Sequence, residues 1–314
     1  MTLDPERVAA FWRFICERHA IFVRRHLRHE PPPWTQDPLL QNGYFCNIYR
    51  DLDRVTRWLT INVLPGGAKA PALSAEDCAF NVLVYRRFCR PDVFMEIGGA
   101  RPMRVYDWDA VSATLRKREQ RGERLFTGAF ILSNAGSHQP KRELVTQHLR
   151  QTANMWSVLW PEVAAAGSLE VAHSRLLAPP GMGPFLAYEA LIDYCNARLV
   201  RHSLDDWAYI GPGALRGAAL VYGREMCRRA ALELASHLRD EQEMMRRTAG
   251  VMLAGPRLTL ENIEQALCEW AKYNRLLKTG RIKRRYAVSN DDLGPWADLP
   301  GHFVDECRWD QQGS

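Results

Sequence analysis

Apolar residues recur at helical spacing along most of this 314-residue chain. This period predicts helices over residues 4–29, 46–64, 75–90, 107–120, 140–160, 219–247 and 259–278. Proline, glycine and alanine interrupt it at 31–38 and 65–74, and residues 125–132 have the pattern of a short extended piece. The pattern therefore predicts a mainly α protein.

Residues 168–193 combine two helical stretches with a turn rich in proline and glycine. A Pro-Pro pair ends the first stretch, and Pro184 suits the start of the second. Gly181 and Gly183 bracket a turn that needs positive φ or a close approach of the backbone. The segment resembles the helix-hairpin-helix of DNA glycosylases, whose hairpin N–H groups and following helix N-terminus hold a DNA phosphate. This implies DNA contacts at Gly181, Met182 and Gly183, with an ordinary αα-hairpin as the alternative.

Charge and cysteine content narrow the function further. The net charge of +6 is consistent with a nucleic-acid partner without establishing one. The eight cysteines show neither zinc-ligand spacing nor the iron–sulfur spacing of many helix-hairpin-helix glycosylases, so no metal or cofactor is expected. No GxxxxGK[ST] loop occurs, which argues against a nucleotide-triphosphate kinase. There is no membrane-length apolar run and no secretory leader, so we expect a cytoplasmic protein without a membrane partner.

A second glycine-rich segment, Gly211–Gly217, has the form GxGxxxG. It differs by one residue from the dinucleotide fingerprint and follows no convincing strand, so it is not a Rossmann motif. Gly211 and Gly213 are counted with the expected DNA-binding residues instead.

Three further segments carry a family resemblance: Phe11–His19 with the arginines and prolines of 24–38, Phe45–Trp58, and Ile263–Tyr273 with the basic run at 280–286. Together they resemble the phage thymine-hypermodification family, first described as α-glutamyl/putrescinyl-thymine pyrophosphorylases and distantly related to DNA glycosylases. Its members act on DNA containing 5-hydroxymethyluracil, some as kinases and others as amino acid:DNA transferases. Because this sequence has no P-loop, the resemblance implies the transferase branch.

The implied reaction transfers an amino acid onto 5-phosphomethyl-deoxyuridine with loss of phosphate, and glycine is the amino acid expected before any other. The implied partners are double-stranded DNA carrying that base, the free amino acid and other phage modification enzymes, in an infected bacterial host. A DNA glycosylase and a non-catalytic DNA-binding module are the alternatives. The expected architecture is an N-terminal helical portion (1–135), a helix-hairpin-helix glycosylase-like portion (136–290) and an irregular tail (291–314), unless these form one continuous domain.

The candidate catalytic residues lie mainly on the helix predicted at 259–278. Glu264, Cys268 and Lys272 fall at i, i+4 and i+8, opposite an apolar side, and are flanked by Glu269 and Tyr273. A carboxylate can deprotonate the amine, a cation can hold the phosphate, and a thiolate could add to the pyrimidine C6. Direct displacement without a covalent intermediate is equally compatible. The alternative is a solvated face held by Glu–Lys pairs.

The remaining candidates are spread along the chain. Asp193 is expected to be catalytic or, alternatively, a buried hydrogen-bonding residue. Asn47, Arg50 and Arg54 would share one polar helical face suited to a phosphate or carboxylate, unless they form a surface ion-pair cluster. A flipped base needs aromatic walls, for which Trp34, Tyr44, Phe45, Tyr188 and Trp207 are candidates. The full expected substrate-binding set is Asn47, Arg50, Asp53, Arg54, Arg18, His19, Trp34, Asp37, Tyr273 and Arg216.

Overall fold

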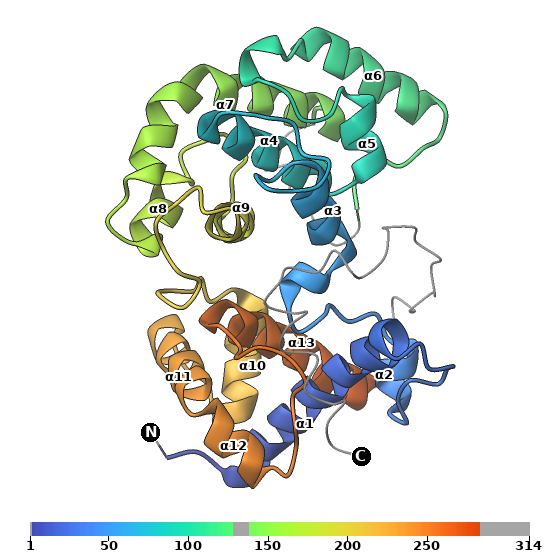
Figure 1. The fold of residues 1–314 in the computed structure, drawn as a ribbon, viewed down its shortest axis with the longest axis vertical. Coiled ribbons are helices and arrows are strands. Elements are labelled where there is room, and N and C mark those ends of the chain that lie inside the picture. Colours follow the sequence, from blue (N-terminus) through green and yellow to red (C-terminus); the bar gives the residue numbers. More distant parts are fainter. Residues whose placement is uncertain (1, 128–137, 283–314) are drawn as a thin grey trace. The chain divides into compact units, whose positions relative to one another are not determined.

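The computed structural model describes residues 2–127 and 138–282 (Figure 1). Within these ranges the regular structure is helical and contains no β-strand, which confirms the mainly α prediction. The contacts divide the chain into two compact units. Unit 1 combines the chain up to Asp53 with the part from Ala208 onward, and unit 2 runs from Arg54 to Trp207. The compact units therefore divide the chain at other places than the linear scheme expected from the sequence.

Unit 1 is organised around two long helices that begin at clear capping signals. Asp4 accepts the N–H of Glu6 at 2.9 Å at the start of the first helix, and Thr259 and Asn262 form a capping box at the start of the last. The elements of unit 1 are α1 (Pro5–Phe22), the π-helical turn η1 (Val23–Leu27), α2 (Pro38–Asn42), the 3₁₀ turn η2 (Arg50–Leu52), α10 (Pro212–Tyr222), α11 (Arg228–Asp240), α12 (Gln242–Thr248) and α13 (Leu260–Thr279). The helices predicted at both ends of this unit are thus confirmed.

Helices α10 and α13 cross at very close range because two glycines of α10 face α13. A Cβ atom built on Gly217 would lie 1.9 Å from the carbonyl oxygen of Leu267, and one built on Gly213 would lie 2.3 Å from Sγ of Cys268. The glycine-rich segment is therefore the first half of α10, and it has a packing role. The continuous helix predicted over 219–247 is wrong, because residues 223–227 separate α10 from α11.

The helix predicted over 46–64 begins only at Arg54, where α3 (Arg54–Asn62) starts unit 2. The preceding residues form a loop because side chains take over the backbone hydrogen bonds. Oδ1 of Asp53 accepts hydrogen bonds from the backbone N–H of Asn47 at 3.0 Å and from Nδ2 of the Asn47 side chain at 3.1 Å. Such local side-chain bonds compete with helix formation. The prediction that Asn47, Arg50 and Arg54 share one helical face is therefore wrong.

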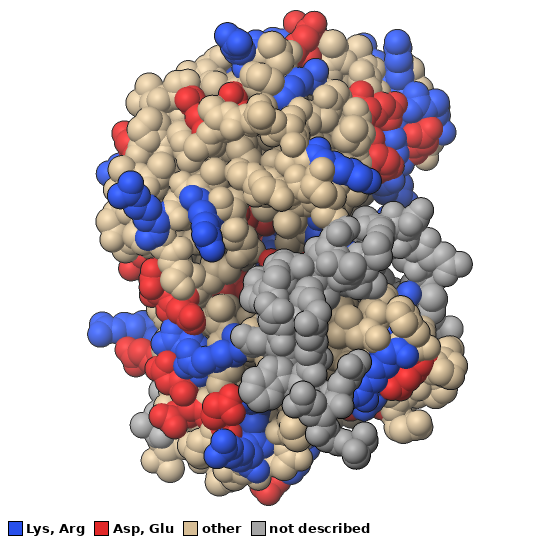
Figure 2. All heavy atoms as spheres, viewed as in Figure 1, with Lys and Arg blue, Asp and Glu red and all other residues tan. Residues whose placement is uncertain are grey.

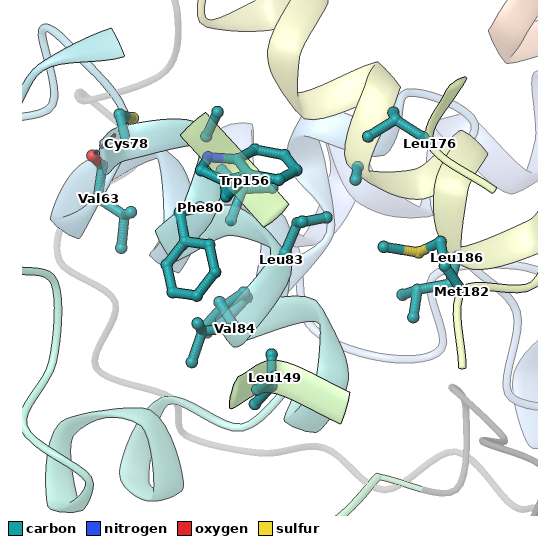
Figure 3. Close-up of a cluster of buried hydrophobic side chains, with 14 of the residues drawn as sticks. Val63, Cys78, Phe80, Leu83, Val84, Leu149, Trp156, Leu176, Met182 and Leu186 are labelled. Atoms are coloured by element: carbon teal, nitrogen blue, oxygen red, sulfur yellow. Dashed lines mark hydrogen bonds between the residues drawn. The ribbon is translucent and has the colours of Figure 1, made fainter. Parts of the chain in front are cut away.

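Unit 2 surrounds a large apolar core. Its elements are α3, α4 (Ala75–Phe88), α5 (Pro91–Glu96), the 3₁₀ turn η3 (Met103–Val105), α6 (Trp108–Gln120), α7 (Lys141–Ala164), α8 (Leu169–Arg175) and α9 (Pro184–Asn196). Figure 3 shows Phe80 and Leu83 of α4 in this core with Trp156 of α7, and Leu176 and Met182 from the turn between α8 and α9. Burial of these side chains fixes the position of that turn.

The two helices and the tight turn predicted between residues 168 and 193 are confirmed as α8, α9 and the turn between them. Only one of the two glycines in this turn has a backbone conformation that favours glycine. Gly181 has a φ of +66°, whereas Gly183 has a φ of −84°, which any residue adopts. Arg87 of α4 is buried and donates to the carbonyl oxygens of Gly181 at 2.5 Å and Pro180 at 2.9 Å. The expectation of positive φ therefore applies to Gly181 and is wrong for Gly183.

Two sequence predictions fall largely outside the described residues. The extended piece expected at 125–132 is described only up to residue 127, where it forms no strand, and the tail from 291 is not described. Among the helices of the described part, none is both long enough and apolar enough to cross a membrane.

Candidate functional site

The polar side of α13 is covered by the loop of residues 43–53, so it is not the solvated face that one reading of the sequence suggested. Glu269 is only 8% exposed, and its Oε2 accepts the backbone N–H of Cys46 at 3.1 Å. Nζ of Lys272 donates to the same oxygen at 3.1 Å, one turn further along the helix. The predicted pair of Glu269 and Lys272 is therefore a partly buried ion pair that anchors the loop.

Asn47 connects this loop to both long helices of unit 1. Nη2 of Arg18, on α1, donates to Oδ1 of Asn47 and to the carbonyl oxygen of Phe45, each at 3.0 Å. From α13, Nε2 of Gln265 donates to the Asn47 carbonyl oxygen at 2.6 Å. The Asp53 carboxylate accepts hydrogen bonds from the N–H and Nδ2 of Asn47. Asn47 therefore connects groups of α1, α13 and the loop of residues 43–53 in one polar cluster.

The electrostatics of this cluster are dominated by burial, which penalises the charged form of its acids. Burial raises the pKa of Glu264 to about 7, and Arg50 and the N–H of Gly211 offset only part of that effect. Burial is also the main reason why the pKa of Asp53 rises to about 6 and that of Glu261 to about 8. Three carboxyl groups thus titrate near neutral pH in one part of the protein, which is common in catalytic sites.

Glu264 lies where α13 meets the start of α10. The backbone N–H of Gly211, the N-cap residue of α10, donates to Oε1 of Glu264 at 3.4 Å. A helix N-terminus carries partial positive charge and favours a carboxylate there. The acid is therefore held in place by a helix terminus, while its raised pKa leaves it able to exchange a proton near neutral pH.

The cysteine of the stripe has different properties from those that a nucleophile needs. Burial, with Glu264 and Glu269 nearby, raises the pKa of Cys268 to about 12. The thiol form therefore predominates at neutral pH, and a thiol is a much weaker nucleophile than a thiolate. Its Sγ packs against Gly213 of α10, where a Cβ atom would lie only 2.3 Å from it, so the helix crossing requires glycine at position 213.

We call the acid–cation cluster the set of side chains gathered on this side of α13: Arg18, Asn47, Arg50, Asp53, Glu261, Glu264, Glu269 and Lys272. Sequence reasoning found all of these except Glu261. That residue lies in the first turn of a helix, where an acid is usually an exposed partner of the helix dipole, so nothing in the sequence indicated its burial. The Cys46 N–H was also missed, because a backbone donor has no signal in a sequence.

Other predicted residues of unit 1 lie apart from the cluster or have other partners. His19 is buried, its Nε2 bonds to the carbonyl oxygen of Ala254, and burial lowers its pKa to about 4. Arg216 is exposed on α10, close enough to Cys268 for its charge to offset part of the rise in the pKa of that thiol. Tyr273 donates to Oδ2 of Asp37 at 2.6 Å, and Asp37 with Trp34 lines a separate cavity.

The residues expected in unit 2 take structural positions. Asp193 is fully buried on α9, and both its oxygens accept from Arg86 of α4, each at 2.6 Å. Arg86 also donates to Thr56 at 3.2 Å. Arg54 lies exposed at the start of α3, and the side chain of Met182 is in the apolar core. Asp193 is therefore a buried ion-pair partner, which is the alternative that the sequence left open.

No group of three or more His, Cys, Asp and Glu side chains in the described ranges is arranged to hold a metal ion. The site in unit 1 is thus an all-α arrangement of carboxylates and cations around a single helix. No solved structure matches the chain.

Comparison with known families covers nearly the whole described chain. Residues 5–283 match the family model described as 5-hmdU DNA kinase, helical domain, and the chain belongs to this family. It is also similar to a 5-hmdU DNA kinase of Bacillus phage SP10, with 26% identity over 88% of this chain and 47% of that protein. The chain therefore spans about half the length of this curated relative. The resemblance to the phage thymine-modification family is confirmed.

Because Asp193 is buried and paired, we expect its substitution to lower the stability of the folded protein. Asp193→Asn keeps the shape but leaves the Arg86 charge uncompensated, so we expect a loss of about 3–5 kcal/mol in the free energy of unfolding. Chemical denaturation measures this loss. Asp109→Asn is the control, because that acid forms an exposed ion pair with Arg150 and should cost at most about 1 kcal/mol. Full stability combined with lost DNA-modifying activity would instead assign Asp193 to the chemistry.

Proposed function

We propose that this protein modifies thymine-derived bases in phage DNA, as an amino acid:DNA transferase. The reaction would join an amino acid, glycine first, to the methylene carbon of 5-phosphomethyl-deoxyuridine with loss of phosphate. Membership in the 5-hmdU DNA kinase helical-domain family supports the role in DNA thymine modification. The sequence contains no P-loop, which favours a step other than phosphorylation by a nucleotide triphosphate.

The observation that carries this proposal is the Glu264 carboxylate, with its pKa raised to about 7 by burial. A general base is most effective when its pKa is close to the working pH. An amine nucleophile has to lose a proton as it forms the new C–N bond, and Glu264 can accept that proton. A solvated carboxylate with an ordinary pKa would be a weaker base for this step.

The cations of the cluster suit the departing group. As the C–N bond forms, the C–O bond to the phosphate breaks and the electron pair leaves with the phosphate oxygen. Positively charged donors stabilise that developing charge. Lys272 and Arg50 are the candidates for this role, since both belong to the acid–cation cluster with Glu264.

The state of Cys268 favours direct displacement over a covalent intermediate. A covalent route needs a thiolate to add to C6 of the pyrimidine, and the raised pKa of Cys268 disfavours that form. Direct attack of the amine on the methylene carbon needs only a base and phosphate-binding cations. We therefore propose the direct route.

DNA contact is proposed at the turn between α8 and α9, through the backbone N–H groups of Gly181 and Gly183. The N–H of Met182, which was expected to contribute, donates to the carbonyl oxygen of Pro179 at 3.1 Å. Gly183 begins α9 without a side-chain cap, which leaves the first-turn donors of that helix for other acceptors. On the face of unit 2 that Figure 2 shows, isolated basic side chains lie among mostly uncharged residues. Among its described residues, this face of unit 2 shows no continuous basic patch.

A second candidate function is favoured by the curated relative itself. The chain covers about half of a protein whose name is 5-hmdU DNA kinase, so it could supply the DNA-recognition half of such an enzyme. On this hypothesis the protein would bind 5-hydroxymethyluracil DNA, and phosphorylation would need ATP and a phosphate-binding loop that this sequence does not contain.

Mass spectrometry of nucleosides distinguishes these functions. The protein is incubated with duplex DNA containing 5-phosphomethyluracil and a pool of amino acids. The transferase predicts an intact strand in which the base loses phosphate and gains the mass of an amino acid. A glycosylase would leave abasic sites, and a pure DNA-binding protein would leave the DNA unchanged. A parallel reaction with 5-hydroxymethyluracil DNA and ATP tests for the phosphate gain that a kinase would produce.

If Glu264 is the base, Glu264→Gln should lower the transfer rate at least about a hundredfold. Because only the deprotonated carboxylate accepts a proton, the wild-type rate should rise with pH through about 7 and then level off. Single-turnover rates between pH 5.5 and 9 measure both effects. Glu233→Gln, an exposed substitution on α11, is the matched control and should keep the wild-type profile.

The same assay tests the direct route. Cys268→Ser should retain a rate within a few-fold of the wild type, since no thiolate takes part. A rate close to zero in a folded Cys268→Ser protein would favour the covalent route. An unchanged pH profile in Glu264→Gln would show that the base lies elsewhere.

The hairpin contact predicts a difference between two neighbouring glycines. Gly181→Ala places a Cβ in a left-handed conformation and 2.2 Å from Nδ1 of His148, so the turn has to change. Gly183→Ala meets no atom within 4 Å and is the control. We expect Gly181→Ala to weaken duplex DNA binding severalfold and Gly183→Ala to change it little, as measured by fluorescence anisotropy. Equal affinities in two well-folded variants would contradict DNA contact at this turn.

A further inference from the structure

A cavity of about 530 Å³ lies in unit 1 outside the acid–cation cluster. It is formed by the end of α1, the π-helical turn η1 and the proline-rich loop that follows. π-helical turns inside α-helices are frequent at functional sites. Its main polar lining residues are Glu17, Arg24, Glu30, Trp34, Thr35 and Asp37. The volume is within the range of small-molecule sites in proteins.

Arg24 lines this cavity with part of its guanidinium unused. Its Nη1 donates to Oε1 of Glu17 at 2.9 Å and to the carbonyl oxygen of Trp34 at 2.6 Å. Both bonds come from this single nitrogen, and among the described residues Nε and Nη2 of Arg24 have no hydrogen-bond partner. A guanidinium edge with two parallel donors matches the two oxygens of a ligand carboxylate.

The opposite charge is present in the same cavity. Glu17, Glu30 and Asp37 contribute three carboxylates to the lining. The nearest cation to the Glu30 carboxylate is Arg28 at 3.9 Å, which is beyond hydrogen-bond distance and leaves acceptor capacity on Glu30. A carboxylate can accept several hydrogen bonds, so these side chains can together bind an ammonium group.

We propose that this cavity binds a free α-amino acid in its zwitterionic form. Arg24 would hold the carboxylate, Glu30 with Glu17 would hold the ammonium group, and Trp34 would lie beside the carbon skeleton. Asp37 contributes negative charge, since its oxygens already accept from Leu39, Leu40 and Tyr273. Arg28, 3.9 Å from Glu30, and Arg25, 5.0 Å from the centroid of the Trp34 ring, add positive charge beside the three carboxylates, so inorganic phosphate is the anion against which the amino acid has to be tested. The inference rests on the proposed function for the fate of the ligand, since transfer requires an amino acid.

The cavity is connected to the acid–cation cluster through one hydrogen bond. Oδ2 of Asp37, on the cavity wall, accepts from the hydroxyl group of Tyr273 at 2.6 Å. Tyr273 follows Lys272 on α13, and its ring packs against Phe45 in the loop that covers the cluster, with centroids 6.2 Å apart. Occupation of the cavity can thus be transmitted to the helix that carries Glu264 and Lys272.

Direct binding of small probes tests this proposal without DNA. Glycine, alanine, serine and glutamate are titrated into the 314-residue protein by isothermal calorimetry or ligand-observed NMR. Acetate and methylammonium serve as half-ligands, and inorganic phosphate as an anion control. We expect at least one amino acid to bind, and each half-ligand to bind at least about tenfold more weakly, because one of the two charged contacts is missing.

Two variants locate the site. Glu30→Gln removes an exposed acceptor charge, and Arg24→Lys keeps the charge but loses the paired donors of the guanidinium. Each should weaken amino-acid binding about tenfold or more, whereas Glu6→Gln, on the exposed start of α1, should leave it unchanged. Circular dichroism and thermal unfolding confirm that all three variants are folded.

The outcomes separate this inference from the proposed function. No binding of any amino acid, equal affinities in all variants, or phosphate binding that the same variants abolish would overturn the cavity assignment. If transfer occurs but Glu30→Gln leaves the KM for the amino acid unchanged, the function stands and the cavity assignment fails. If the cavity binds amino acids and no transfer is found with modified DNA, the binding site stands and the transferase proposal fails.

Discussion

The close crossing of α10 and α13 is the constraint on which the rest of unit 1 depends. It requires Gly217 against the backbone of Leu267, because any side chain there would force the helices apart. The same crossing puts Glu264 at the N-terminus of α10 and leaves no room for a side chain at Gly213 beside Cys268. Glu264 of the acid–cation cluster is therefore positioned by a packing requirement at Gly217, several residues away.

Burial then gives these acids their chemical character. Glu264, Glu261 and Asp53 lie together where desolvation raises their pKa values into the neutral range, with cations that offset the effect only in part. Asp193 in unit 2 is equally hidden, but a bidentate partner satisfies its charge completely. The interaction partner of a buried acid thus determines whether its charged form is stabilised, as in Asp193, or its pKa is raised, as in Glu264.

The proposed chemistry assigns separate tasks to neighbouring parts of unit 1. The acid–cation cluster offers a base and phosphate-binding groups, while the cavity beside η1 offers both charges that an amino acid requires. The Asp37–Tyr273 hydrogen bond joins the two parts. In this proposal the amino acid is recognised by one set of groups, and the proton transfer and phosphate release are carried out by another.

Periodicity, capping residues and proline are local signals, and from them the sequence predicts the helical class, most helix positions and the turn after α8. The family followed from the resemblance of several segments. It also selected Glu264, Cys268 and Lys272 as one stripe flanked by Glu269, since helical spacing fixes which residues share a face. It placed Asn47, Arg50 and Arg54 on a helix that does not exist, because the bonds between Asn47 and Asp53 that replace helical ones depend on the loop conformation. The burial of Glu269, the pairing of Asp193 with Arg86, and the position of Arg24 in a cavity with carboxylates became visible only in the folded protein. Burial and long-range pairing depend on which distant segments meet, and local sequence patterns carry no record of that.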